Sequence, residues 1–370
     1  MKILMFGPAY GHNIQPFIDF FENNISFDLT FAYSGKNDFL ASTKNVKFVE
    51  YSKNPLSLCK LSLTIKKEYD IIWYHGGYEL NLLFLIHSFK NKKTKLILNV
   101  WGEHIPRILL KDNAEGKKYF KYYNKADIIQ CNWYGIQNLL LQKFQKTKLP
   151  VLPWGLDKEF FENGDVQINS TTEKFISSIN HHKINFFYPK SFTEASDHRC
   201  IIEACRLLNE KGISNFCIYF WSGNVSRGNF EIEAVNNISK YNLQDIIKIE
   251  KHEFLPFYDI KLIWKQMDCG LQIAINDQLS STLLEPMFLE KELIATNIEP
   301  YQLLNNKFPE LKLKLIKREP EVLAHEMNEI INGKRTSETI LENRKKIIEK
   351  EFNFEKNIQK MLDFYQELIP

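Results

Sequence analysis

Short apolar runs alternate with longer amphipathic runs along this 370-residue chain, and the series occurs twice. The runs are apolar on both faces, which is typical of parallel strands covered by helices on both sides of a sheet. In the first half, strands are expected at 2–7, 27–34, 46–51, 70–75, 95–101, 126–131 and 149–153. Helical patterns fall between most of them, as at 79–90 and 134–146.

The alternation pauses at 158–182, which is polar and lacks strand periodicity. It resumes with strands expected at 184–188, 216–221, 246–250, 269–275, 291–296 and 312–316, and with helices at 199–210, 230–241, 258–266, 281–290, 336–350 and 354–368. This pattern predicts an α/β protein of two Rossmann-like, doubly wound domains that face a central cleft. The expected divisions are an N-terminal domain at 1–157, a linker at 158–182, a C-terminal domain at 183–350 and a closing helix at 351–370.

Cysteine spacing argues against a disulfide framework or a zinc site. The six cysteines form no CxxC pair, and no His/Cys cluster has zinc-ligand spacing. We therefore expect free thiols, no metal and no cofactor. The chain also shows no leader-like N-terminus and no apolar run near the ~20 residues that a membrane-spanning helix needs, so a cytoplasmic location is expected.

Charge is distributed unevenly along the chain. Residues 1–155 hold 21 Lys and Arg against 12 Asp and Glu, whereas the remainder holds 27 against 33. A basic first half suits an anionic partner, such as a phospholipid surface or a pyrophosphate-linked acceptor. An AT-rich genome, which raises the use of Lys, Asn, Ile and Phe codons throughout, explains the excess of lysine in the first half equally well. The basic residues are dispersed and accompany no nucleic-acid motif, so we expect no nucleic-acid partner.

The segment 268–296, DCGLQIAINDQLSSTLLEPMFLEKELIAT, carries the most chemical information. A strand is expected to end near Ile275, and a helix to open at Ser281 or Thr282 after a polar loop. Ser280 and Ser281 are good N-cap residues. The N-terminus of a helix that follows a strand attracts anions, so a diphosphate would fit there. Carboxylates accept hydrogen bonds from hydroxyl groups. Asp277 could therefore bind the hydroxyl groups of a sugar, and Glu285 those of a ribose.

Six segments together resemble the retaining GT-B glycosyltransferases of family 4. The spacing Asp277-x7-Glu285 resembles the E-x7-E signature of that family. The other segments, in matching order, are NVWGEH (99–104), ADIIQCN (126–132), PWGLD (153–157), IIEACRLL (201–208) and FNFEKNIQKMLDFYQEL (352–368). In the family, the last of these is a helix that crosses back onto the N-terminal domain. The resemblance covers most of the chain.

The resemblance implies a donor site in the C-terminal domain. Glu285 would bind the ribose, Asp277 the hydroxyls of the transferred sugar, and Lys190 the diphosphate. The helix start at Ser280, Ser281 and Thr282 would support the diphosphate, with Arg199 as the nearest second cation. The loop that begins at Gly223 is either a nucleotide-base loop or a simple connector.

The acceptor side is implied in the N-terminal domain. The loop with Gly7, Tyr10, Gly11 and His12 would face the reacting centre. A second group of residues would line the acceptor site: Trp101, Glu103 and His104. The segment 117–123 mixes lysines with aromatic residues and is either a membrane contact or a solvated helix with its aromatics in the core.

The sequence departs from the family pattern at several positions. Asp277 stands where Glu is usual, and Ser280 stands where Gly is usual. Pro286 follows Glu285 inside the expected helix, where it removes an N–H. Ser196 takes the place of the family's second phosphate-binding lysine, and Trp101 takes the place of a histidine.

The function implied is transfer of a hexose from a nucleotide-diphosphate sugar, such as a UDP-sugar, to a glycan or lipid-linked acceptor. The transfer would proceed with retention and without metal, in bacterial surface polysaccharide synthesis, with possible peripheral contact to an anionic membrane. One alternative is an inverting GT-B transferase or a nucleotide-sugar epimerase, with His12 or Glu103 as base. Another is a non-catalytic partner subunit of the same fold, which the departures at Ser196 and Pro286 motivate.

Overall fold

The chain divides into two compact units in the computed structural model. The first comprises Met1–Trp154 with Phe354–Pro370, and the second comprises Gly155–Asn353. The structure describes residues 1–8, 11–35, 43–76, 79–102, 104–144, 148–162, 168–222, 228–251 and 255–369, except for the side chains of 11–13, 222 and 251.

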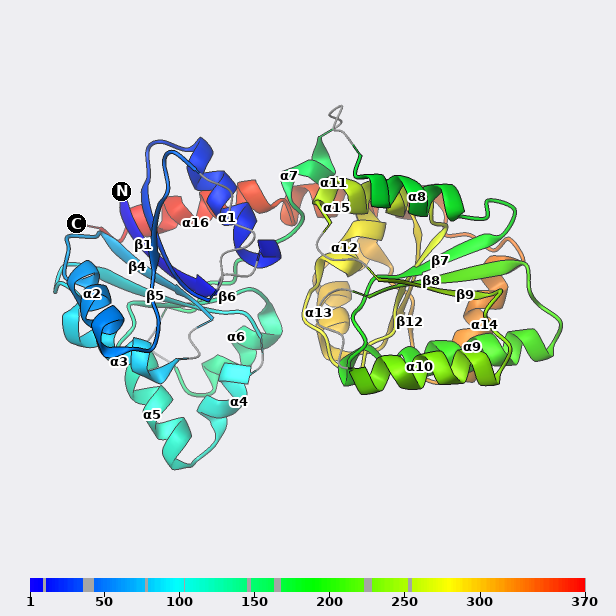
Figure 1. The fold of residues 1–370 in the computed structure, drawn as a ribbon, viewed down its shortest axis with the longest axis horizontal. Coiled ribbons are helices and arrows are strands. Elements are labelled where there is room, and N and C mark those ends of the chain that lie inside the picture. The colour runs from blue at the N-terminus through cyan, green and yellow to red at the C-terminus, as the bar shows by residue number, and fades with distance from the viewer. Residues whose placement is uncertain are drawn as a thin grey trace. The chain divides into compact units, whose positions relative to one another are not determined.

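The first unit is built on a six-stranded parallel sheet in the order β3-β2-β1-β4-β5-β6 (Figure 1). Its strands are β1 (Lys2–Pro8), β2 (Asp28–Ser34), β3 (Lys47–Glu50), β4 (Ile71–His75), β5 (Lys95–Val100) and β6 (Ile128–Cys131). Strand order reverses between β1 and β4, so the carboxyl ends of these two strands flank the topological switch point of the sheet.

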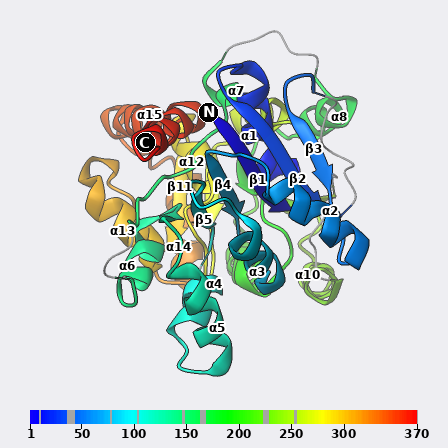
Figure 2. The same cartoon turned by 90° about the vertical axis from the view of Figure 1, so that its left-hand side faces the viewer.

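Alternate residues of each strand face opposite layers of helices. Leu4 and Phe6 pack toward α2 (Pro55–Ile65), α3 (Leu80–Phe89), α4 (His104–Leu110), α5 (Ala114–Tyr123) and α6 (Tyr134–Leu141). Ile3 and Met5 pack toward α1 (Gly11–Asn23) and α16 (Phe354–Gln366). The closing helix α16 therefore belongs to the first unit, as predicted (Figure 1; in Figure 2 it is the red helix at the C-terminus). Its apolar stripe supplies the buried residues Ile358, Met361, Leu362 and Tyr365.

The second unit repeats this plan with the sheet order β12-β11-β10-β7-β8-β9, again all parallel. Its strands are β7 (Ile184–Tyr188), β8 (Phe216–Ser222), β9 (Ile247–Lys251), β10 (Cys269–Gln272), β11 (Glu292–Thr296) and β12 (Leu315–Ile316). Here the order reverses between β7 and β10. The two sheets thus confirm the predicted pair of doubly wound α/β domains.

Helices cover both faces of the second sheet. One face packs against α9 (His198–Glu210), α10 (Gly228–Lys240) and α14 (Pro320–Ile331). The other packs against α8 (Ser170–Ser178) and α11 (Phe257–Lys265). The unit also contains α7 (Lys158–Phe161), α12 (Ser281–Phe288), α13 (Glu299–Lys307) and α15 (Glu338–Glu351). No helix among the described residues is long and apolar enough to cross a membrane.

Two expected segments differ from the structure. Residues 149–153 make isolated bridges, such as Val151 to Cys131, and no full strand. The segment 158–182, expected as a linker, contributes α7 and α8 to the second unit. Phe160 and Phe175 are the buried aromatic residues of these two helices. Short polar helices with so few apolar residues were missed because helix prediction depends on apolar residues that recur at helical spacing.

The chain enters and leaves the second unit at one tight contact. Leu156 donates its backbone N–H to the carbonyl of Phe352 at 2.7 Å. Gly155 has φ of +82°, and a Cβ there would lie 2.0 Å from the same carbonyl oxygen. Only glycine fits this position, because it tolerates the left-handed region and lets two backbones approach closely.

Candidate functional site

The candidate donor site lies at the topological switch point of the second sheet. Lys190 follows the end of β7, and Asp277 follows the end of β10 in the adjacent position of the sheet. The Tyr188 hydroxyl joins the two strand ends, contacting the carbonyl oxygens of Ser196 and Ile273 at 2.6 and 2.8 Å. In doubly wound sheets, ligands bind outside the carboxyl ends of the strands at this point.

One carboxylate oxygen organises the site. Asp277 Oδ2 accepts hydrogen bonds from Lys190 Nζ at 2.8 Å, Ser280 Oγ at 2.8 Å and Tyr301 OH at 2.7 Å. Lys190 Nζ also donates to Ser280 Oγ at 3.0 Å. The Lys190 and Asp277 side chains are only 16% and 15% exposed, so their charges are weakly screened by solvent. The structure therefore brings together Lys190, Asp277 and Ser280, three of the predicted site residues.

The N-terminus of α12 opens directly beside this cluster. Ser280 is the N-cap residue, but its side chain makes no capping hydrogen bond. Its hydroxyl instead donates to Asp277 and lies 3.0 Å from the hydroxyl of Thr282. The helix end thus keeps its partial positive charge next to the Lys190 ammonium group, an arrangement that attracts a phosphate group.

Glu285 lies one turn further along α12 and is 2% exposed. Its Oε2 accepts a hydrogen bond from Trp264 Nε1 at 2.6 Å. Burial raises the pKa of the Glu285 carboxyl, while hydrogen bonds from Trp264 and Ser281 and the charge of Lys190 act in the opposite direction. A buried carboxyl group with a perturbed pKa that lies near a cation is typical of functional sites, where such pKa values concentrate.

Pro286 is accommodated inside α12 without breaking the helix. A proline removes the N–H that would bond to the carbonyl four residues earlier, here that of Thr282. Gln272 Nε2 donates to this same carbonyl at 2.6 Å and replaces the missing bond. Gly270 provides the room, since a Cβ there would lie 3.1 Å from Pro286 Cγ. The departure from the family pattern at Pro286 is therefore compensated within β10.

Three residues of the site were not predicted from the sequence: Tyr301, Trp264 and Gln272. Tyr301 is fully buried on α13, which follows β11, the neighbour of β10. Burial raises the pKa of Tyr301 well above its usual value, so its hydroxyl stays a donor to Asp277. The only signal for Tyr301 in the sequence was its place shortly after the predicted strand 291–296. That place indicates a site residue only once the order of the strands in the sheet is known.

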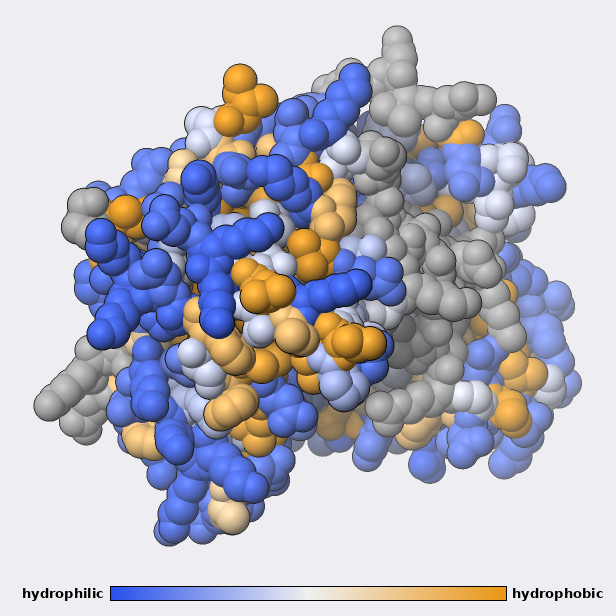
Figure 3. Space-filling view, turned by 60° about the vertical axis from the view of Figure 1, so that its left-hand side comes forward, coloured by the Kyte–Doolittle hydropathy of each residue, from blue (hydrophilic) through white to orange (hydrophobic). Residues whose placement is uncertain are grey.

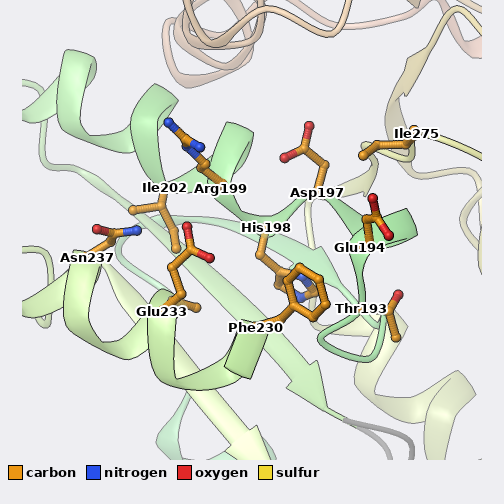
Figure 4. A pocket seen from close by; sticks show the side chains of 11 residues that line it. Thr193, Glu194, Asp197, His198, Arg199, Ile202, Phe230, Glu233, Asn237 and Ile275 are labelled. Carbon is orange, nitrogen blue, oxygen red and sulfur yellow. The ribbon is translucent and has the colours of Figure 1, made fainter. Parts of the chain in front are cut away.

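Other predicted residues of the second unit lie apart from the cluster or outside the described chain. Arg199 lies on α9, where it is exposed and lines a separate pocket (Figure 4). At the start of that helix, the side chain of His198 faces inward and is buried. The next residue, Arg199, is rotated by about 100° around the helix axis and therefore faces outward. Ser196 is buried, and Gly223 lies outside the described residues.

The predicted acceptor-side residues belong to the first unit. Gly7 lies on β1, where a Cβ would come within 2.9 Å of Ile14 Cδ1. Trp101 follows β5 and packs edge-on against Trp154, with ring centroids 4.8 Å apart. His104 is exposed at the start of α4. Tyr10 and Glu103 lie outside the described residues, and so does the side chain of His12, which follows Gly11 at the start of α1.

No family model matches the chain, and no curated protein matches it in sequence. Its fold is similar to that of HepE from Anabaena, determined in complex with UDP, at 15% identity over 99% of this chain and 100% of HepE, with a TM-score of 0.75. It is also similar to a glycosyltransferase from Rickettsia africae, at 18% identity over 100% of this chain and 98% of that protein, with a TM-score of 0.75. A third similar structure is the sucrose-phosphate synthase of Thermosynechococcus elongatus. It shares 13% sequence identity over 100% of this chain and 99% of the synthase, with a TM-score of 0.75. The chain therefore has the two-domain Rossmann-like fold, GT-B, that was predicted from the sequence.

The raised pKa of Glu285 predicts a pH-dependent effect of Glu285→Gln on stability. Below about pH 4.5, the carboxyl is protonated in both the folded and the unfolded chain. As pH rises through the raised folded-state pKa, the folded protein must ionise a buried group, and the free energy of unfolding falls. Glutamine keeps an acceptor for Trp264 and does not ionise. We expect the melting temperature of Glu285→Gln, relative to wild type, to rise as pH increases from 4.5 to 7.

A control for this experiment is Glu68→Gln, which changes an exposed carboxylate that lies outside the helices. Its melting temperature relative to wild type should stay constant across the same pH range. A constant difference for Glu285→Gln as well would contradict the burial-driven shift of the Glu285 pKa.

Proposed function

We propose that the second unit binds a nucleotide-diphosphate sugar and that the protein transfers its hexose to a glycan or lipid-linked acceptor. The observation that carries this proposal is the joining of Lys190, Asp277 and Ser280 at the switch point, beside the N-terminus of α12. A cation and a helix N-terminus that converge on one point suit a diphosphate. HepE, which shares the fold, has been determined with UDP and with UDP-glucose, and this supports UDP as the nucleotide of the donor.

The chemistry needs stabilisation of the leaving diphosphate. As the bond between C1 of the sugar and the phosphate oxygen breaks, negative charge grows on the phosphate. Lys190 and the α12 N-terminus would stabilise that charge electrostatically, and they would do so without a metal ion. Asp277 would remain held by Ser280 and Tyr301 when Lys190 turns toward the phosphate.

We propose that the transfer retains the anomeric configuration. The acceptor oxygen forms the new bond to C1 on the face from which the diphosphate leaves, and its proton passes to the departing phosphate oxygen. This route uses no protein base, which agrees with a cluster whose only carboxylate, Asp277, already accepts three hydrogen bonds on one oxygen. We propose bacterial surface polysaccharide synthesis as its setting.

Replacing Lys190 tests the proposed donor site. Lys190→Ala should reduce release of nucleoside diphosphate from UDP-glucose by roughly 100- to 1,000-fold, as expected for loss of one electrostatic contact to developing charge. The control Lys211→Ala removes an exposed lysine next to α9 and should leave the rate unchanged. A chelator should have no effect on either protein. Activity that survives Lys190→Ala would refute the assignment, and no turnover or binding with any of a panel of nucleotide sugars would favour the partner-subunit alternative.

The outer face of α2 suits the peripheral membrane contact that we also propose. Leu56 and Leu63 are 78% and 59% exposed, and Phe84 on the contacting helix α3 is 54% exposed. Lys60 lies on the same face of α2, Lys67 follows the end of the helix, and both are exposed. Apolar residues lie among hydrophilic ones on this side of the first unit (Figure 3). Exposed leucines flanked by lysines are typical of helices that lie on anionic lipid.

The segment 117–123 does not supply such a contact. Tyr119 and Tyr123 are buried, Phe120 packs against the same core, and Lys117, Lys118 and Lys121 are exposed. The aromatic residues of this segment therefore lie in the core and its lysines in solvent, as the solvated-helix interpretation expects.

Vesicle sedimentation tests the membrane proposal. The protein should sediment with vesicles that contain phosphatidylglycerol and stay in solution with pure phosphatidylcholine. Leu63→Glu should weaken this binding roughly tenfold, since burial of one leucine is worth about 1.5 kcal/mol or more. The control Leu141→Glu changes an exposed leucine on α6 and should bind as wild type does. Equal binding by both variants, or none by wild type, would refute the α2 contact.

A further inference from the structure

A pocket between α9 and α10 has no part in the proposed donor site. It has a volume of about 180 Å³ and lies within the second unit. It shares no lining residue with the cluster of Lys190, Asp277 and Ser280. The side chains that surround it come from α9, the loop before it and α10, with Ile275 from the segment after β10 (Figure 4). Its size is below the roughly 300 Å³ at which pockets for drug-sized ligands begin, so it accommodates one small ring.

The floor of the pocket is apolar and partly aromatic. Phe230, half-buried at the start of α10, lies beside the buried residues Ile202 and Ala234. Phe230 also packs against the hydrophobic core of the unit, which fixes its position. Such a surface favours the C–H face of a ring over a fully charged ligand.

The rim offers both acceptors and donors of hydrogen bonds. Glu194 and Glu233 supply carboxylates, Arg199 supplies a guanidinium and Asn237 an amide. Among the described residues, no hydrogen bond ties up these four side chains, and the charge of Arg199 interacts with that of Glu203, one turn along α9. Asp197 also lines the pocket and is paired with Arg318. Acidic groups outnumber Arg199 around the pocket, so its lining disfavours a phosphate or another anion.

His198 provides a buried polar atom at the same pocket. The residue is 5% exposed, and its Nε2 has no hydrogen-bond partner among the described residues. Burial lowers the pKa of His198 to about 3, so the ring is neutral. Hydrogen bonds to the backbone of Lys190 and Ser196 act in the opposite direction and raise the pKa less than burial lowers it. Backbone carbonyls only accept, so the nitrogen facing them carries the proton and Nε2 is an acceptor. Nε2 itself has almost no exposed surface, because the ring packs among Tyr188, Phe192 and Phe220, so His198 contributes to the wall of the pocket through its ring.

We infer that this pocket binds one uncharged pyranose ring, either as a free monosaccharide or as the end residue of a glycan. Hydroxyl groups both donate and accept, so they match the carboxylates of Glu194 and Glu233 as well as the guanidinium of Arg199. The C–H face of the ring would lie against Phe230. This inference goes beyond the proposed transfer, and it does not depend on the donor site.

Saturation-transfer NMR with UDP present tests the pocket. The ligands are methyl α-D-glucopyranoside and methyl α-D-galactopyranoside for a free ring, and maltotriose for a glycan end. Wild type should bind at least one of them saturably. Phe230→Ala and Glu233→Gln should each weaken that binding roughly five- to tenfold, from loss of the aromatic contact or of a charged acceptor. Val235→Ala, an exposed position on the same helix outside the pocket, is the control and should bind as wild type does.

The outcomes separate the two sources and the two sites. Binding of a methyl glycoside indicates a free ring, and binding of maltotriose alone indicates a glycan end. UDP should raise the melting temperature of all three variants equally, because Lys190 and Asp277 are unchanged. Failure of UDP to bind would count against the donor site and not against the pocket. Absence of sugar binding, or binding that Phe230→Ala and Glu233→Gln leave unchanged, would overturn the pocket assignment.

Discussion

The carboxylate of Asp277 is the acceptor on which the architecture of the candidate site depends. It draws together Lys190 from the end of β7, Ser280 from the start of α12 and Tyr301 from α13, three segments far apart in the sequence. Hydrogen bonds to an ionised group are about twice as strong as neutral ones, and here they are largely shielded from solvent. The strand ends on both sides of the switch point are thereby held at fixed positions, with a cation and an uncapped helix N-terminus side by side.

Several features of the same region act against stability and are compensated nearby. Glu285 is a buried carboxyl whose main support is the Trp264 indole. Pro286 removes a helix hydrogen bond, and the Gln272 side chain restores it from β10. Gly270 leaves space for the proline ring. Unfavourable groups that are held in place by specific partners are expected where a protein has been shaped for binding or catalysis, because stability alone would favour apolar packing.

The fold was predictable because its signal is repeated. Strands such as β4 and β7 are short apolar runs between amphipathic helices, and α16 carries its whole apolar stripe in sequence. Lys190, Asp277 and Ser280 could be placed together because each follows the carboxyl end of a predicted strand. Tyr301 and Trp264 could not, since their proximity depends on which strands are neighbours in the sheet. Arg199 was expected at the diphosphate, but whether a side chain at a helix start faces inward depends on the helical phase, and here His198 faces inward.

The central claim is that Lys190 recognises a diphosphate. Calorimetric titration of wild type and Lys190→Ala with UDP and with uridine tests it most directly, since the two ligands differ only in the diphosphate. Wild type should bind UDP much more tightly than uridine, and Lys190→Ala should lose most of that difference while its affinity for uridine is unchanged. Equal affinity of wild type for the two ligands, or a preference for UDP that survives in Lys190→Ala, would contradict the claim.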